Sequence, residues 1–254
     1  METKEIVSYA TLLHNARLKA NSIEQLSHHM TEFSRPDAYF IQESGINLRE
    51  GMGEFVIGLK MGLTSEAKRK QMNLDSPLYG VLTDRMQVQD GGIFSLKESI
   101  HPKIEPEVAF MMGSDLEGEV SLDQVIGAID WVYPAMEILD SRYQGFKYFS
   151  MEDVIADNSS SSHFVLGNDC VELSKINIEN LNMKMIVNGS LAHEGNSNAI
   201  SGNPLNSVIE LCRLLNERGE KLMAGQIVLA GAATAAVSLE AGMSISLEVE
   251  GLGS

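Results

Sequence analysis

The chain has 254 residues, of which 44% are hydrophobic and 21% charged, and this composition is typical of a globular protein with a sizeable core. Its 35 Asp and Glu residues outnumber its 19 Lys and Arg residues, which gives a formal net charge of −16. A surface this acidic repels phosphate backbones and anionic lipids, so we expect no nucleic-acid partner and no membrane partner, and any anionic ligand would need local positive charge.

The N-terminus and the cysteines indicate the compartment. The segment from Met1 to Ala10 lacks the basic and then apolar arrangement of a signal peptide, and no apolar run approaches the ~20 residues that a membrane-spanning helix needs. Cys170 and Cys212 lie far apart and match no metal-ligand spacing, and free thiols suit a reducing environment. We therefore expect a cytoplasmic protein.

The first 52 residues are predicted to form an N-terminal helical lobe. Apolar residues recur every three or four positions from Glu5 to about Leu26, which predicts an amphipathic helix that breaks near Ser22. Ser22 is then expected to cap a second short helix. Another helix is predicted to start at Pro36 and to run to about Arg49.

Residues 53–254 are predicted to form the core of an α+β fold. A polar helix is expected to open with Thr64–Ala67, and further helices are expected from Ser121 to Ile129 and from Asn206 to Arg218. The strands do not alternate regularly with helices, so we expect long-range strand pairing instead of βαβ units. The predicted strands are Phe55–Gly62 and residues 103–112, 131–139, 163–166, 183–189, 226–230 and 244–250.

The strand that follows His101 carries the first candidate residues for chemistry. Because side chains alternate along a strand, Lys103, Glu105 and Glu107 share one face and the apolar residues share the other. Two carboxylates so close together repel each other unless a cation lies between them or one is protonated. Mg²⁺ or Mn²⁺ prefers such oxygen ligands. The alternative is a charged strand edge that faces solvent.

A third carboxylate, Glu137, lies inside the almost wholly apolar run from Trp131 to Asp140. A carboxylate in such a place is costly unless it is paired or bound to a metal ion. Glu137 therefore either joins Glu105 and Glu107 around a cation or forms a salt bridge, for instance to Arg142. Three oxygen ligands would leave positions open for water or substrate, as a catalytic Mg²⁺ site requires.

Lys60 lies within an apolar strand, where a lysine is unexpected. It either acts as a partly buried cation that attracts a substrate carboxylate or transfers a proton, or it extends its ammonium group to solvent at the strand end. Asp84, after the next apolar segment, is expected to pair with Lys60 or to cap a turn.

Two further segments combine small and hydroxyl-bearing residues. The run from Asn158 to Ser162 would bind a carboxylate or form an ordinary polar loop. The run from Gly231 to Val237 contains one hydroxyl, that of Thr234, among small residues that allow close backbone approach to a ligand.

Five ordered segments stand out in the chain: Gly58–Ser65, His101–Glu107, Glu137–Tyr143, Ala156–Ser161 and Gly251–Ser254. Together they resemble the hydratase/decarboxylase branch of the fumarylacetoacetate hydrolase superfamily, and the resemblance spans the chain from about residue 37 to its end. The last glycine-rich segment of the family commonly reads Gly-Gly-(Leu/Ile)-Thr, and here Ala232 and Ala233 replace part of it.

The resemblance implies a mixed β-sheet roll or barrel behind the helical lobe. It implies that Glu105, Glu107 and Glu137 bind Mg²⁺ or Mn²⁺, and that Lys60 and Asp84 act as catalytic residues. It also implies substrate contacts from a further set of polar side chains, namely Asn158, Ser160, Ser161 and Thr234.

Within this branch, Asp140–Lys147 and the Lys-Met-Gly form of the first segment are more similar to the decarboxylases of 2-oxohex-3-enedioate, also called 4-oxalocrotonate, than to the 2-hydroxypenta-2,4-dienoate hydratases. The expected activity is therefore release of CO₂ from this small 2-oxo dicarboxylic acid in the meta-cleavage degradation of aromatic compounds. The alternatives are the hydratase, an acylpyruvate C–C hydrolase and an inactive structural partner. The resemblance further implies a homo-oligomer, in complex with such a hydratase.

Overall fold

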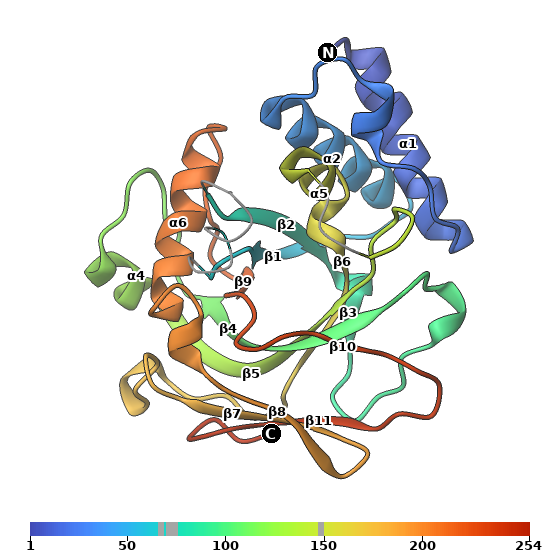
Figure 1. The fold of residues 1–254 in the computed structure, drawn as a ribbon. Coiled ribbons are helices and arrows are strands. Elements are labelled where there is room, and N and C mark those ends of the chain that lie inside the picture. Colours follow the sequence, from blue (N-terminus) through green and yellow to red (C-terminus); the bar gives the residue numbers. More distant parts are fainter. Residues whose placement is uncertain (66–68, 70–75, 147–149) are drawn as a thin grey trace.

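The computed structural model describes residues 1–65, 69, 76–146 and 150–254, so the helix predicted to open with Thr64–Ala67 falls largely outside the described residues. The described residues form helices that flank one large curled sheet and one small sheet, and the α+β prediction is confirmed (Figure 1). Within these residues, no helix is long and apolar enough to cross a membrane. The division of the chain at residue 52 stays a prediction.

Two long helices precede the first strand. They are α1 (Thr3–Lys19) and α2 (Arg35–Glu50). The Ser34 side chain caps α2 by accepting from the amide of Asp37, which satisfies one of the free donors of the first turn. The predicted helix after Ser22 is wrong: the backbone of Ile23 pairs with the segment around Tyr143, and only a 3₁₀ turn, Leu26–His29, follows. Tertiary pairing therefore overrides the local capping pattern.

The large sheet has the strand order β2-β1-β9-β4-β5-β6-β3, and β10 pairs with β4 off this path. A separate three-stranded sheet has the order β11-β7-β8. The strands of the large sheet are β1 (Val56–Gly62), β2 (Leu78–Thr83), β3 (Gln87–Val88), β4 (Lys103–Met112), β5 (Ile129–Leu139), β6 (Ser161–Leu166), β9 (Ile227–Leu229) and β10 (Val237–Ser238). Those of the small sheet are β7 (Asn182–Val187), β8 (Ser190–Asn196) and β11 (Ile245–Val249).

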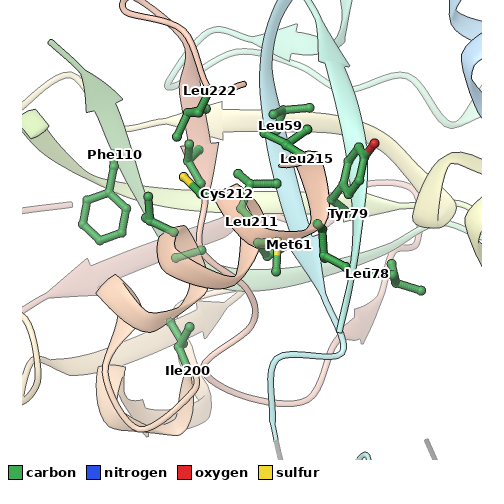
Figure 2. Close-up of a cluster of buried hydrophobic side chains, with 14 of the residues drawn as sticks. Leu59, Met61, Leu78, Tyr79, Phe110, Ile200, Leu211, Cys212, Leu215 and Leu222 are labelled. Carbon is green, nitrogen blue, oxygen red and sulfur yellow. The ribbon is translucent and has the colours of Figure 1, made fainter. Parts of the chain in front are cut away.

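The outer face of the large sheet is covered by apolar contacts. Leu59 and Met61 of β1 pack in one cluster with Leu211 and Leu215 of α6 (Pro204–Asn216) (Figure 2). Farther along the sheet, the small sheet supplies Met185, which packs on the outer face of β4 and β5. The remaining helices are α4 (Leu122–Ala128) and α5 (Met151–Ala156). Since neighbouring side chains on a strand point to opposite faces, Lys60 between Leu59 and Met61 must face the inside of the curl.

One part of the inner face is apolar. Ala109, Ala135, Phe164 and Leu229 come from four neighbouring strands and form one buried cluster. This cluster fills the curl beside the inward-facing carboxylates of β4 and β5. The polar site therefore lies against a packed apolar floor.

Candidate active site

The three glutamates lie together because of the pairing between β4 and β5. Glu105 and Glu107 share one face of β4, and Glu137 is the direct partner of Glu105 on β5. One oxygen from each of the three carboxylates lies within 4.8 Å of the others. Like charges at directly paired positions are destabilising unless something compensates them. The structure therefore concentrates negative charge at one place on the inner face.

Glu107 shows the electrostatic consequence. Glu107 and Glu137 are 0% exposed, and burial raises the pKa of Glu107, with Glu137 and Glu105 raising it further. Glu107 Oε2 accepts from the backbone amide of Gly231 at 2.8 Å, while its Oε1 is buried without a hydrogen-bond partner in the described chain. An unpaired buried oxygen among converging carboxylates fits a hard divalent cation, which takes oxygen ligands.

Lys60 provides one positive charge at this cluster. It is buried, and its ammonium lies 2.9 Å from Glu137 Oε2, 3.1 Å from Ser159 Oγ and 3.3 Å from the Ser159 carbonyl oxygen. Burial lowers the pKa of Lys60, but the neighbouring carboxylates, Glu137 above all, outweigh it, so the pKa is raised and the ammonium stays charged. The alternative in which Lys60 reaches solvent is wrong.

The contact between Lys60 and Glu137 depends on the curl of the sheet. Lys60 is on β1 and Glu137 on β5, and β9 and β4 lie between these strands. On a flat sheet, three strand spacings would separate the two backbones by roughly 14 Å. Because the sheet curls, the ammonium and the carboxylate meet inside it.

The loop from Asn158 to Ser161 borders Lys60 and Glu137. Asn158, Ser159 and Ser160 all have φ between 50° and 55°, a conformation that costs energy for residues other than glycine. Asn158 holds the loop to β2, since its side chain accepts from the Val81 amide at 2.8 Å and donates to the Val81 carbonyl at 2.9 Å. The loop then directs the Ser161 hydroxyl to Glu137 Oε1 at 2.8 Å.

A glycine on β2 makes room for this loop. A Cβ atom at Gly80 would lie 2.8 Å from the Asn158 carbonyl oxygen and 3.2 Å from Cδ of Lys60. Any larger residue would push the loop away from the lysine.

Arg142 also stabilises this loop by hydrogen bonds. Its guanidinium donates to the side chain and carbonyl of Asp157 and to the Ser161 carbonyl. The possible salt bridge between Glu137 and Arg142 is therefore not formed, because Arg142 pairs with Asp157 and Glu137 with Lys60.

Asp84 lies outside the cluster, and its predicted pairing with Lys60 is wrong. It is exposed in the 3₁₀ turn Asp84–Met86 that follows β2, and its carboxylate accepts from the amide of Phe55 at 2.7 Å. Asp84 therefore fastens the start of β1, which is the alternative role of a turn cap.

Thr234 lies on the segment that runs beside β4. The Ala233 amide donates to the Pro106 carbonyl at 3.0 Å, and Val237 pairs with Ile104. Thr234 therefore lies at about the level of Glu105 along β4. Its hydroxyl donates to the Ala235 carbonyl at 3.1 Å. Of the predicted binding residues, Ser161 contacts a glutamate of the cluster directly, whereas Asn158 acts through the loop.

Two contributors were not predicted from the sequence. Ser159 supplies two acceptors to Lys60, and Gly231 supplies a backbone donor to Glu107. A backbone donor leaves no mark in a residue pattern, and the serine run gave no reason to choose Ser159 over its neighbours.

A family model described as fumarylacetoacetate (FAA) hydrolase C-terminal matches residues 20–254. The chain belongs to the fumarylacetoacetate hydrolase family. This confirms the family that the five segments suggested.

Two curated relatives and one solved structure cover nearly the whole chain. A 4-oxalocrotonate decarboxylase from Pseudomonas putida is 38% identical over 100% of this chain and 96% of its own length. A 2-hydroxyhexa-2,4-dienoate hydratase from Comamonas testosteroni is 35% identical over 95% of this chain and 92% of its own. The structure of 4-oxalocrotonate decarboxylase from Pseudomonas putida G7, complexed with magnesium and adipate, matches with a TM-score of 0.97 and 38% identity, covering 100% of this chain and 96% of that one.

Proposed function

We propose that this chain is a metal-dependent carboxy-lyase that converts 2-oxohex-3-enedioate to 2-hydroxypenta-2,4-dienoate and CO₂. The observation that carries the proposal is the convergence of three carboxylates beside a buried lysine. The full-length similarity to a 4-oxalocrotonate decarboxylase supports this choice of substrate.

Glu105, Glu107 and Glu137 would hold Mg²⁺ or Mn²⁺ through their converging oxygens. A bound divalent ion supplies a Lewis acid that stabilises negative charge on the C2 oxygen of a 2-oxo acid. The protein fixes the ligands in advance: Gly231 orients Glu107, and Ser161 and Lys60 together orient Glu137. Such outer contacts keep ligands in place and limit the cost of reorganisation during reaction.

The reaction breaks the bond between C5 and C6 of the substrate. The electron pair of this bond moves through the conjugated C3–C4 double bond to the C2 oxygen, CO₂ leaves, and one proton completes the enol product. Lys60 is a buried ammonium held by Ser159 and Glu137, so it is placed to attract the C1–C2 end and to transfer that proton. The apolar floor of Ala109, Ala135 and Phe164 limits the access of water to the dienol.

The remaining predicted residues take two roles in the proposal. Asn158 positions the serine loop by its two hydrogen bonds to Val81. Ser160 and Thr234 stay candidates for hydrogen bonds to the substrate. Asp84 is left out of the proposed machinery because its carboxylate is occupied at the start of β1.

The alternative activity is hydration of 2-hydroxypenta-2,4-dienoate. The relative at 35% identity is a hydratase of the related 2-hydroxyhexa-2,4-dienoate, and it supports hydration because addition of water to the dienol would use the same metal-binding carboxylates and lysine. We also propose that the protein forms a homo-oligomer and a complex with a hydratase. A cytoplasmic location is proposed as well, since a reducing environment suits the two free cysteines, Cys170 and Cys212.

Glu107→Gln tests the ligand assignment. The variant keeps the size of the side chain and an acceptor for Gly231, but it removes one of three converging charges. We expect divalent-metal binding, measured by calorimetry, and CO₂ release to fall by at least about 100-fold, because a neutral amide is a poor ligand for a hard cation. The metal-free variant should be as stable as the wild type or more so, because repulsion is relieved.

The matched control is Glu119→Gln, which removes an exposed carboxylate. It should bind metal and release CO₂ as the wild type does. Near-native metal binding and turnover in Glu107→Gln would show that the assignment is wrong.

A further inference from the structure

Lys103 is a second cation near the candidate site. It is the first residue of β4, two positions before Glu105, and strand alternation places it on the same face as Glu105 and Glu107. Its ammonium donates to the Phe146 carbonyl oxygen at 3.4 Å and lies 4.3 Å from the centre of the Phe146 ring. Within the described residues these partners are neutral, and Lys103 forms no ion pair there.

The other lysine at the site is assigned to the 2-oxo acid end of the substrate. Lys60 is shared between Glu137 and Ser159 in the interior. A dicarboxylic substrate brings a second negative charge to a chain whose net charge is already −16, so this charge needs a partner of its own.

The spacing along β4 matches the length of the substrate. Five carbon–carbon bonds of about 1.5 Å each separate its two carboxyl carbons, which gives an extended chain of roughly 6 Å. Two residues along a strand advance by roughly 6.6 Å. A substrate whose 2-oxo acid end lies at Glu105 therefore carries its other carboxylate to the level of Lys103.

The surroundings of Lys103 suit the carbon chain. Leu139 is its direct partner on β5. The Phe146 ring lies under the ammonium and 5.4 Å from the ring of His101.

We propose that Lys103 binds the substrate carboxylate that leaves as CO₂, and that it makes the site prefer dicarboxylic to monocarboxylic 2-oxo acids. This inference rests on the proposed function. The contact is strongest with the intact substrate and weakens as CO₂ departs, so its removal should raise KM and should not lower kcat. The product keeps one carboxylate and no longer interacts with Lys103.

The test compares two ligands of equal length, 2-oxoadipate and 2-oxohexanoate, which differ in the far carboxylate. Their binding to the Mg²⁺-loaded protein is measured by calorimetry. The wild type should bind 2-oxoadipate more tightly. In Lys103→Met, the affinity for 2-oxoadipate should fall about tenfold or more, as expected for loss of a hydrogen bond to a charged group, while that for 2-oxohexanoate stays within about twofold.

Two further variants separate charge from structure. Lys103→Arg keeps the positive charge and should retain most of the preference for 2-oxoadipate. Lys97→Met removes an exposed lysine outside the sheet and should change neither affinity.

The inference is overturned if Lys103→Met lowers the affinity for both ligands equally, or if the variant still prefers 2-oxoadipate as the wild type does. A failure of the Lys103 assignment can be told apart from a failure of the proposed function, because the Lys103 test measures ligand binding and not CO₂ release. A lysine-dependent preference for the dicarboxylate in a protein that releases no CO₂ would refute the decarboxylase and keep the Lys103 assignment.

Discussion

At the scale of single residues, the site is defined by charges that burial makes costly. Glu107 and Glu137 are held inside the sheet with Lys60, so three carboxylates face one internal ammonium. Buried charges that are incompletely compensated are rare in a stable fold unless function requires them. A divalent ion would remove this imbalance, which explains why the chain retains the arrangement.

His163 gives the molecule a pH dependence that is separate from the metal site. Burial lowers the pKa of His163 to about 4, with Arg49 and Arg17 lowering it further. The unfolded chain binds the proton near pH 6.5, so between pH 6.5 and 4 it holds more protons than the folded chain, and stability falls as the pH falls. This residue should account for about 2–3 kcal/mol of that loss.

Denaturant unfolding at pH 7 and pH 4.5 measures the effect. His163→Asn should lose less stability between these pH values than the wild type, whereas His28→Asn, at an exposed position, should lose as much as the wild type. Equal losses in both variants would refute the assignment to His163.

At the scale of elements, the site depends on loops that hold the strand residues in place. The sequence pattern predicted that Glu105 and Glu107 share a face and that Glu137 is anomalous in an apolar run, because the two-residue period of a strand is local information. The direct pairing of Glu105 with Glu137 depends on a register between distant strands. The predicted pairing of Asp84 with Lys60 failed for the same reason. The position of Asp84 after an apolar segment does not show which end of that strand lies next to the site.

Among the described glycines with positive φ, Gly231 has the tightest surroundings for an added side chain. Its φ is +114°, and a Cβ atom would lie 2.4 Å from Oγ1 of Thr64. Gly231→Ala should therefore cost roughly 2–4 kcal/mol from backbone strain and overpacking. It should also weaken metal binding, because the amide that orients Glu107 must move.

Gly242→Ala is the matched control, since Gly242 has φ of +85° and open space around its Cβ direction. Its cost should be limited to the backbone, roughly 1 kcal/mol, with unchanged metal binding. Urea unfolding and metal titration of both variants measure the difference. Equal effects in the two variants would contradict the role of the Thr64 contact.

At the scale of the whole molecule, the curl of the large sheet brings Lys60 and Glu137 together across two intervening strands (Figure 1). Most strands of the predicted α+β fold could be located from apolar runs, but β2, β3, β8 and β10 were not predicted as strands. The helices and the small sheet pack on the outer face of the curled sheet, and these contacts are not encoded in any one segment.

The most direct test of the account is a product-resolved assay with 2-oxohex-3-enedioate, with and without EDTA. We expect one CO₂ for each 2-hydroxypenta-2,4-dienoate formed, loss of both on chelation, and their return when Mg²⁺ or Mn²⁺ is added back. Metal-dependent addition of water to the dienoate without CO₂ release would favour the hydratase. CO₂ release that continues unchanged in EDTA would contradict the metal-based account altogether.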